Sequence, residues 1–398
     1  MNIAFLSFDG NVGEGGVQTV SYILATEFRK YGVKSFLICD AIRSKNCPEC
    51  YEDRVLYRNS EDNEILNKFI LENSIRIVIN NCVVRSVYYG SEIRDILKKN
   101  NCKLVSIIHA KPDLIKVTPS VRSLLWDIRT SSGFLIKLNL IIRLLAFPLY
   151  KVISNKKYIS WRKLLYDNSD KVVVLSEKYI HNLCAMINVP ERNKKILAIA
   201  NPLRFNIDLT EDEIKGKQNE ILVVSRLDES SKGLSKVFKI WRDIEKTNKY
   251  NNWYLTVVGS GKDGDYYKHL CTKYKLANVS FEGFQNPLLY YKRAKIFLMT
   301  SFHEGLPMSV LEAQQCGMPV VAFNNFESIV DLVVDGYNGF VVKANDVTGF
   351  VQSLENIMDD ESLYFSMSKH SVLNSRRFSS RVVVKHWMEL FNELCGDE

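Results

Sequence analysis

The chain has 398 residues and a mass of 45.8 kDa, enough for two or three domains of ordinary size. A hydrophobic fraction of 46% and a charged fraction of 25% are typical of a folded globular protein. They exclude a disordered chain, a collagen-like chain and a small disulfide-rich protein. The net charge of +8 is compatible with a nucleic acid, an anionic membrane or a phosphorylated ligand, so its location matters.

Short apolar runs rich in β-branched residues alternate with helical patterns along the chain. The predicted strands are 2–7, 33–39, 75–80, 103–108 and 171–175, and then 220–225, 253–258, 279–282, 295–300 and 319–323. Apolar strands separated by helices indicate α/β architecture with parallel sheets covered on both faces. The polar stretch 201–219 divides the series into two doubly wound domains. We therefore expect domains 1–200 and 201–379, with a C-terminal helix 380–398 joining the first, and ligands beyond the carboxyl ends of the strands.

The cysteines and the N-terminus favour the cytoplasm. Nine scattered cysteines, an odd number, indicate a reducing compartment, and the lone Cys47-Pro-Glu-Cys50 motif lacks further zinc ligands. Residues 1–7 read as a strand without the basic region or cleavage site of a signal peptide. The most apolar stretch, 134–153, contains Lys137, Arg143 and Lys151, so a membrane-spanning helix is not expected.

A glycine-rich turn follows the first predicted strand. Gly10, Gly13, Gly15 and Gly16 lie between that strand and a helical pattern beginning near Val17. Glycines in this place let backbone N–H groups approach an anion at the helix N-terminus. The turn has neither a Walker A nor a G-x-G-x-x-G sequence, and a flexible turn without a ligand is the alternative.

Two cations follow the sixth predicted strand in one loop. Arg226 and Lys232 flank Leu227-Asp-Glu-Ser-Ser231, just before a helix rich in apolar residues. A pair of cations beside a helix N-terminus suits a diphosphate. The alternative is a solvated loop.

Two carboxylates lie eight residues apart after the ninth predicted strand. Glu304 is in the loop, and Glu312 is in the helix predicted to begin at Pro307 and to stop at Gly317. Carboxylates accept bidentate hydrogen bonds from vicinal hydroxyls, so a ligand with both a diphosphate and sugars is indicated. Alternatively, Glu304 only offsets the helix dipole and Glu312 is a surface residue.

The run Glu304-Gly-Leu-Pro-Met-Ser-Val-Leu-Glu-Ala313, followed by 317–322, resembles the E-x7-E signature of the family 4 retaining glycosyltransferases. Further similar pieces occur in the expected order at 15–16, 173–177, 200–202, 225–227, 232–233, 257–261 and 281–284. The resemblance covers nearly the whole chain and is looser over 40–165. It implies a GT-B fold of two Rossmann-like domains facing across a cleft, the second holding a nucleotide-diphosphate sugar.

The same resemblance implies roles for individual residues. Arg226 and Lys232 would bind the diphosphate and offset charge on the leaving group, Glu312 would hold the ribose, and Glu304 would contact the donor sugar. The remaining implied contacts to sugar, phosphate and base belong to Gly15, Gly16, Phe284, Gln285, Gly305, Leu306 and Met308.

The resemblance also implies a role for one histidine and a reaction mechanism. His109 ends the fourth predicted strand, where similar enzymes carry a histidine that touches sugar or acceptor; a structural histidine is the alternative. Retention in this family proceeds by front-face displacement within an ion pair, so Glu304 is not expected to be a nucleophile. Catalysis then depends on positioning and on stabilising the diphosphate. The family works without a metal, so Asp263-Gly264-Asp265 is read as a polar loop and no cofactor is expected.

The positive charge is concentrated in residues 111–163, an insertion between the fourth and fifth predicted strands. This segment has eleven Lys and Arg residues and two Asp residues, so the rest of the chain is close to neutral. Apolar residues recur at helical spacing, and aromatic residues lie among the cations. Such a segment suits an anionic membrane surface; the alternative is a set of helices packed on the first sheet. Localised charge without a recognisable motif argues against nucleic acid.

These observations predict a cytoplasmic enzyme at the membrane surface. It would transfer a hexosyl or N-acetylhexosaminyl group, from a UDP-sugar in preference to a GDP-sugar, to a saccharide or lipid-linked saccharide in cell-surface polysaccharide biosynthesis. The alternatives are a GT-B sugar-nucleotide epimerase and a non-catalytic protein that binds sugar nucleotides or nucleic acid.

Overall fold

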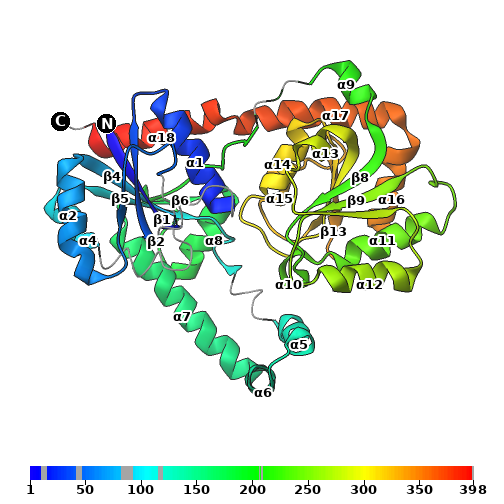
Figure 1. Cartoon of the computed structure of the whole chain (residues 1–398), viewed down its shortest axis with the longest axis horizontal. Coiled ribbons are helices and arrows are strands. Elements are labelled where there is room, and N and C mark those ends of the chain that lie inside the picture. Colours follow the sequence, from blue (N-terminus) through cyan, green and yellow to red (C-terminus); the bar gives the residue numbers. More distant parts are fainter. Residues whose placement is uncertain are drawn as a thin grey trace. The chain divides into compact units, whose positions relative to one another are not determined.

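The computed structural model describes residues 1–9, 16–41, 47–81, 93–114, 120–205, 207 and 209–396. The chain divides into two compact units, Met1–Arg204 with Ser380–Glu398, and Phe205–Ser379. The division falls at 204/205, close to the polar stretch in the sequence. Each unit is built on a parallel sheet with helices, which confirms the predicted fold of two Rossmann-like α/β domains (Figure 1).

The sheet of the first unit has seven parallel strands in the order β3-β2-β1-β4-β5-β6-β7. Its strands are β1 (Asn2–Asp9), β2 (Lys34–Ala41), β3 (Arg54–Leu56), β4 (Ile75–Asn80), β5 (Lys103–Ile108), β6 (Lys171–Val174) and β7 (Ile196–Ala198). The chain runs outward from β1 to β3 and then returns to place β4 on the other side of β1. The strand order therefore reverses between β1 and β4, which are hydrogen-bonded neighbours.

The described residues of the first unit form eight helices, which include the C-terminal one. They are α1 (Gly16–Arg29), α2 (Asn63–Glu72), α4 (Arg94–Lys99), α5 (Val121–Thr130), α6 (Phe134–Leu145), α7 (Phe147–Asn168), α8 (Lys178–Ile187) and α18 (Ser380–Cys395), with a 3₁₀ turn at Ser60–Asp62. The ring of Phe28 on α1 lies 5.2 Å from that of Phe391 and 6.3 Å from that of Trp387. This aromatic packing is the reason why the last helix lies beside α1 (Figure 1).

Three helices of the basic segment leave the body of the first unit. Ser120 caps α5 through its side chain, Ala146 separates α6 from α7, and Pro148 occupies the first turn of α7. Leu165, near the end of α7, packs in a core cluster with β5, β6 and α8. Figure 1 shows α7 leading away from the sheet toward α5 and α6. Within segment 111–163, Lys111, Asp113, Leu124 and Arg162 are buried, whereas no residue of α6 is, so the two alternatives for this segment apply to different parts of it.

The sheet of the second unit has six parallel strands in the order β10-β9-β8-β11-β12-β13. They are β8 (Gln218–Val224), β9 (Tyr254–Val258), β10 (Val279–Gly283), β11 (Ala294–Met299), β12 (Val320–Asn324) and β13 (Gly339–Lys343). Here the order reverses between β8 and β11, which are hydrogen-bonded neighbours. In sheets of this kind ligands bind at that position, beyond the carboxyl ends of the strands.

The helices of the second unit enclose one large apolar core that includes Phe238, Trp241 and Tyr364. They are α9 (Glu211–Lys215), α10 (Glu229–Lys232), α11 (Ser235–Glu245), α12 (Gly264–Tyr274), α13 (Leu288–Arg293), α14 (Met308–Gln315), α15 (Ile329–Leu332), α16 (Val347–Asp359) and α17 (Glu361–Ser375), with a 3₁₀ turn at Arg376–Phe378. The polar stretch predicted as a divider contains α9, because Thr210 and Glu213 form a capping box.

Candidate active site

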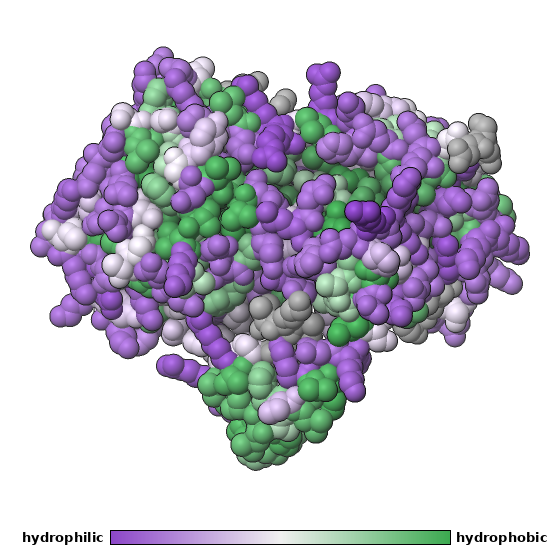
Figure 2. Space-filling model, turned by 180° about the vertical axis from the view of Figure 1, so that it is seen from behind, coloured by the Kyte–Doolittle hydropathy of each residue, from purple (hydrophilic) through white to green (hydrophobic). Residues whose placement is uncertain are grey.

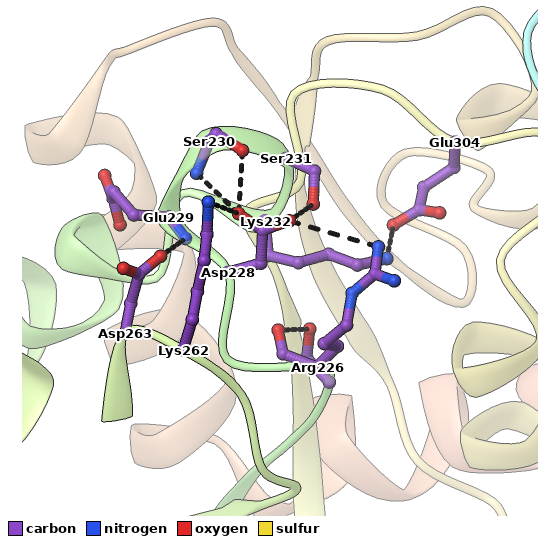
Figure 3. Close-up of polar contacts among 10 residues, drawn as sticks. Arg226, Asp228, Glu229, Ser230, Ser231, Lys232, Lys262, Asp263 and Glu304 are labelled. Atoms are coloured by element: carbon purple, nitrogen blue, oxygen red, sulfur yellow. Dashed lines mark hydrogen bonds and ion pairs between the residues drawn. The ribbon is translucent and has the colours of Figure 1, made fainter. Parts of the chain in front are cut away.

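The charged residues of the second unit meet at the reversal point of its sheet. Arg226 and Lys232 follow β8, and Glu304 follows β11, so each comes from the carboxyl end of one of the two strands that flank this point. Figure 3 shows the Lys232 and Glu304 side chains pointing toward each other, and the Arg226 guanidinium facing Asp228 of the same loop. The sequence placed these residues in separate loops, and the sheet order explains why the loops are neighbours.

Hydrogen bonds around Asp228 shape the loop after β8. Its carboxylate accepts from the backbone N–H of Ser230 at 3.1 Å, from the Ser230 hydroxyl at 2.7 Å and from the Ser231 hydroxyl at 3.2 Å, and so caps α10. Burial raises the pKa of Asp228, but these hydrogen bonds and the charge of Lys262 outweigh burial and leave the pKa below its ordinary value. Asp228 therefore stays ionised and holds α10 in place.

Two further acidic residues lock the base of the same loop. The Asp263 carboxylate accepts from the backbone N–H of Glu229 at 2.7 Å, and both residues are buried. The Glu229 carboxylate accepts from the backbone N–H and hydroxyl of Ser235 and from the Tyr267 hydroxyl. Gly264 and Asp265 begin α12, so the Asp263-Gly264-Asp265 motif is a helix start and not the polar loop predicted.

Two glycines let the loops after β8 and β9 approach each other backbone to backbone. A Cβ on Gly259 would lie 1.9 Å from the carbonyl oxygen of Ser225, and one on Gly261 would lie 2.4 Å from that of Leu227. The contact is made by hydrogen bonds from Ser225 N–H to Val258 and from Leu227 N–H to Ser260, each 3.0 Å long. Arg226, between these two donors, thus has its backbone fixed on both sides.

The loop after β11 also holds α10. The Thr300 hydroxyl donates to the carbonyl of Lys232 at 3.0 Å, and the Phe302 N–H donates to that of Ser231 at 2.9 Å. Gly233 has a φ of +60°, and a Cβ there would lie 2.8 Å from the Phe302 ring. The buried Lys236 ammonium lies 4.4 Å from the centroid of the same ring. The two loops are therefore joined before any ligand binds.

An ion pair between Lys232 and Glu304 also joins the loops after β8 and β11. The Lys232 ammonium lies 2.5 Å from a Glu304 carboxylate oxygen, and the two side chains are 20% and 16% exposed. The Arg226 guanidinium is 69% exposed and lies 4.0 Å from Asp228. Asp228 caps the helix start, so the charged groups that remain around it are Arg226, Lys232, Glu304 and the half-exposed Lys262, which lies 3.8 Å from Asp228. Such a set can bind an anion and accept hydrogen bonds from hydroxyls beside it.

The remaining predicted ligands of the second unit lie at its strand ends and on α14. Pro307 precedes α14, Glu312 is buried on the second turn, and Gly317 follows the helix with a φ of +64°. Phe284 and Gln285 follow β10 and are exposed. Of the other predicted positions, Gly305 and Leu306 are buried in the loop before α14, and Met308 is the half-buried first residue of that helix.

A chain of hydrogen bonds joins His109, after β5, to Asn81, which follows β4 at the reversal point of the first sheet. The Ser21 hydroxyl donates to the Val17 carbonyl at 2.9 Å and accepts from the Asn81 amide nitrogen at 2.7 Å. The Asn81 carbonyl oxygen then faces His109 Nε2 at 2.9 Å. Because that oxygen can only accept, Nε2 carries the proton and Nδ1 is an acceptor.

Burial lowers the pKa of His109 from 6.5 to about 4, so the ring is neutral near pH 7. A neutral imidazole with an acceptor nitrogen can receive a hydrogen bond from a hydroxyl group. Ser21 and Asn81 were not singled out by the sequence, since they lie 60 residues apart and only the fold joins them. Of the predicted glycines in this unit, Gly16 is the first residue of α1, and Gly15 lies outside the described residues.

Candidate metal ligands are not clustered in the described part of the chain. No group of three or more His, Cys, Asp or Glu side chains is placed there to hold a metal ion. Burial raises the pKa of the Cys50 thiol to about 12 and also raises that of Cys47, so both remain protonated thiols.

No helix in the described ranges is long and apolar enough to cross a bilayer.

Comparison with known proteins shows which families and structures this chain is similar to. Residues 206–372 match the family of group 1 glycosyl transferases. An uncharacterized glycosyltransferase of Haemophilus influenzae is 29% identical over 293 residues, which are 70% of this chain and 80% of that protein. The chain of Anabaena HepE solved in complex with UDP has the same fold, with a TM-score of 0.71 and 16% identity over 99% of this chain and 100% of that one.

A third similarity is to a Campylobacter jejuni enzyme that acts on an undecaprenol-linked glycan. It is the GalNAc-alpha-(1->4)-GalNAc-alpha-(1->3)-diNAcBac-PP-undecaprenol alpha-1,4-N-acetyl-D-galactosaminyltransferase, 23% identical over half of this chain and 55% of its own length. Together, the family match, these relatives and the two-unit fold support a glycosyltransferase of GT-B type.

Proposed function

We propose that the chain is a retaining glycosyltransferase of family 4, with Glu304 and Glu312 as its E-x7-E pair. It transfers a hexosyl or N-acetylhexosaminyl group from a nucleotide-diphosphate sugar, UDP in preference to GDP, to a saccharide or lipid-linked saccharide. The observation that carries this proposal is the Lys232–Glu304 ion pair beside Arg226 at the reversal point of the second sheet.

The accessible cations are assigned to the diphosphate. Lys232 and Arg226 bind its oxygens and offset the charge that develops as the nucleoside diphosphate leaves. Their loop is held from three sides by Asp228, Gly259 and Thr300, so little reorganisation is needed when the charge forms. This preorganised positive charge takes the place that a metal ion has in other sugar transferases, and we propose a metal-independent reaction.

The carboxylates are assigned to hydroxyl groups. Glu304 accepts from the donor sugar, and its contact with Lys232 links the sugar to the diphosphate end of the ligand. Glu312 holds the ribose. The base is assigned to Phe284 and Gln285, and the phosphate and sugar contacts of the backbone are assigned to Gly15, Gly16, Gly305, Leu306 and Met308.

Transfer with retention is assigned to a front-face displacement. The acceptor hydroxyl enters on the face from which the diphosphate leaves, and a diphosphate oxygen receives the proton, so no covalent carboxylate intermediate forms. Neutral His109, held with Nδ1 as an acceptor, hydrogen-bonds a hydroxyl of the sugar or acceptor.

The acceptor is assigned to a cell-surface glycan at the cytoplasmic face of a membrane. Two observations support this assignment: the basic segment 111–163 of this chain, and the undecaprenol-linked acceptor in the name of the C. jejuni relative. Acidic lipids attract Lys and Arg at the bilayer surface, which brings the enzyme to a lipid-linked substrate.

The test is transfer from a panel of UDP- and GDP-sugars to lipid-linked saccharides, with NMR of the anomeric configuration in the product. Glu304→Ala and Lys232→Ala should each lower kcat/KM by roughly 10²–10³-fold while circular dichroism is unchanged. The control Lys268→Ala, an exposed lysine on α12, should retain activity. Full activity of both site variants would refute the assignment, and conversion of the sugar nucleotide without acceptor would identify an epimerase.

A further inference from the structure

The helix α6 is apolar on almost its whole circumference, and none of its twelve residues is buried. Only Lys137, Asn139 and Arg143 are polar in its sequence. Phe134, Leu135 and Leu145 are 78%, 77% and 80% exposed, the values of side chains that contact almost nothing. An apolar surface of this kind on a folded protein indicates an interaction site.

The exposed apolar surface continues onto the beginning of α7. Leu149, Val152 and Ile153 are each at least half exposed and follow the turn at Ala146. Figure 2 shows the result as a continuous apolar projection formed by this part of the first unit. The surface is convex, whereas a groove for a peptide or helix would be concave. We call α6 and the first half of α7 the apolar arm.

The charges around the apolar arm have one sign. Residues 128–166 contain eight Lys and Arg residues and no Asp or Glu. Lys157 stacks over Trp161 at 4.8 Å, and Arg143 over Tyr150 at 5.4 Å, so cations and aromatic rings lie next to the apolar surface. Amphipathic aromatic rings and basic residues are the groups that favour the headgroup region of an acidic bilayer.

The length of α6 decides how it can enter a bilayer. At 1.5 Å per residue its twelve residues extend about 18 Å, well short of the ~30 Å hydrocarbon core. A helix of this length cannot span the membrane, but it can lie in the interface with its side chains in the outer part of the acyl region.

We propose that the apolar arm inserts into the interface of an acidic lipid bilayer and anchors the first unit there. The proposal goes beyond attraction of the basic segment to the surface: apolar burial supplies most of the binding energy, and the cations select acidic lipid. It rests on the exposure and charge of the described residues and requires no particular sugar, acceptor or reaction.

The experiment is flotation of the full-length protein with vesicles of phosphatidylcholine, with and without phosphatidylglycerol, at low and raised salt. We compare the wild type with Leu135→Glu/Leu145→Glu and with the matched control Ile65→Glu/Leu71→Glu, which alters two exposed residues on α2 of the same unit. All four side chains are exposed, so both variants should fold.

The arm variant should bind acidic vesicles roughly a hundredfold more weakly than the wild type, and the control variant should bind like the wild type. Wild-type binding should survive in part at raised salt, because apolar insertion is not screened. Lys156→Gln/Lys157→Gln should reduce the preference for acidic lipid roughly tenfold.

Three results would overturn the proposal: equal binding of the arm variant and the wild type, complete release of the wild type by salt, or no binding to either vesicle. A sedimentation measurement without lipid separates a fourth outcome. If the wild type is a dimer and the arm variant a monomer, the arm contacts a second copy of the chain and not a membrane.

Discussion

The reversal points of the two sheets have the same topology and opposite chemistry. In the second unit the site is charged: Lys232 and Glu304 form an ion pair, and Arg226 lies 4.0 Å from Asp228. In the first unit, Ser21, Asn81 and His109 form a neutral chain of hydrogen bonds, and burial keeps the histidine uncharged. A parallel sheet thus provides the place for a ligand, while the loops decide whether that ligand is an anion or a hydroxyl-bearing group.

The largest expected effect comes from a substitution that forces apart the loops after β8 and β9, which hold the charged site of the second unit. Gly259→Ala places a Cβ 1.9 Å from the Ser225 carbonyl, at a φ of +137°. The two loops must separate, and we expect the free energy of unfolding to fall by roughly 3–5 kcal/mol. Gly336→Ala is the matched control, because its φ of +72° has no neighbour within 4 Å and should cost about 1–2 kcal/mol. Urea unfolding measures both, and equal losses would show that the close approach at Gly259 is unimportant.

The next largest effect distinguishes the contributions of Lys232 and Arg226 to activity. Lys232 is mostly shielded from solvent and paired, whereas Arg226 is largely exposed, so its charge is better screened by water. We expect Lys232→Met to lower kcat/KM roughly 10²–10³-fold and Arg226→Met roughly tenfold. Steady-state kinetics with a saturating acceptor gives both values. An Arg226 effect equal to that of Lys232 would mean that Arg226 becomes shielded in the complex.

The neutral His109 of the first unit should affect how the free energy of unfolding depends on pH. His109 has a pKa of about 4 in the native protein and about 6.5 when unfolded, so the unfolded chain binds the additional proton between these values. Its contribution to stability is present above pH 6.5 and falls by up to about 3 kcal/mol as the pH drops toward 4. In His109→Gln this part of the slope should be lost, as measured by urea unfolding from pH 4 to 8. Parallel curves for the two proteins would contradict a neutral His109 with a lowered pKa.

The smallest effect concerns the Asp263-Gly264-Asp265 motif. Asp265 is exposed in the first turn of α12, so Asp265→Asn should change activity less than about twofold, and a chelator should leave transfer unchanged. Asp263→Asn should instead cost about 1–2 kcal/mol, since its carboxylate accepts from the buried Glu229 N–H. Loss of activity in Asp265→Asn, restored by a divalent metal, would indicate a metal site at this motif.

Most of the sheet architecture could be predicted from the sequence. All ten predicted strands are present with ends within two residues, because long β-branched runs are buried on both faces of a parallel sheet. The strands β3, β7 and β13 were missed. The first two have three residues each at the sheet edges, and such short segments lack a periodicity that distinguishes them from loops.

The candidate site was predictable in part. Arg226, Lys232 and Glu304 could be found as charged residues after buried strands, but their contact depends on the strand order. The hydrogen bonds of Asn81 to Ser21 and His109 join residues 60 and 28 positions apart, which no local pattern reveals. The spacing of Leu135, Leu138 and Ile142 predicted a helix correctly. It could not predict that α6 is exposed, because periodicity does not say whether an apolar face is covered.

The most direct test of this comparison is the affinity for UDP, measured by calorimetry for the wild type, Lys232→Ala, His109→Gln and the control Lys268→Ala. If the diphosphate is held by the charged loops of the second unit, Lys232→Ala should weaken UDP binding at least about tenfold, the loss of one charge-assisted contact. His109→Gln and Lys268→Ala should bind like the wild type. Unchanged affinity in Lys232→Ala, or a larger loss in His109→Gln, would contradict the assignment of the donor to the charged site.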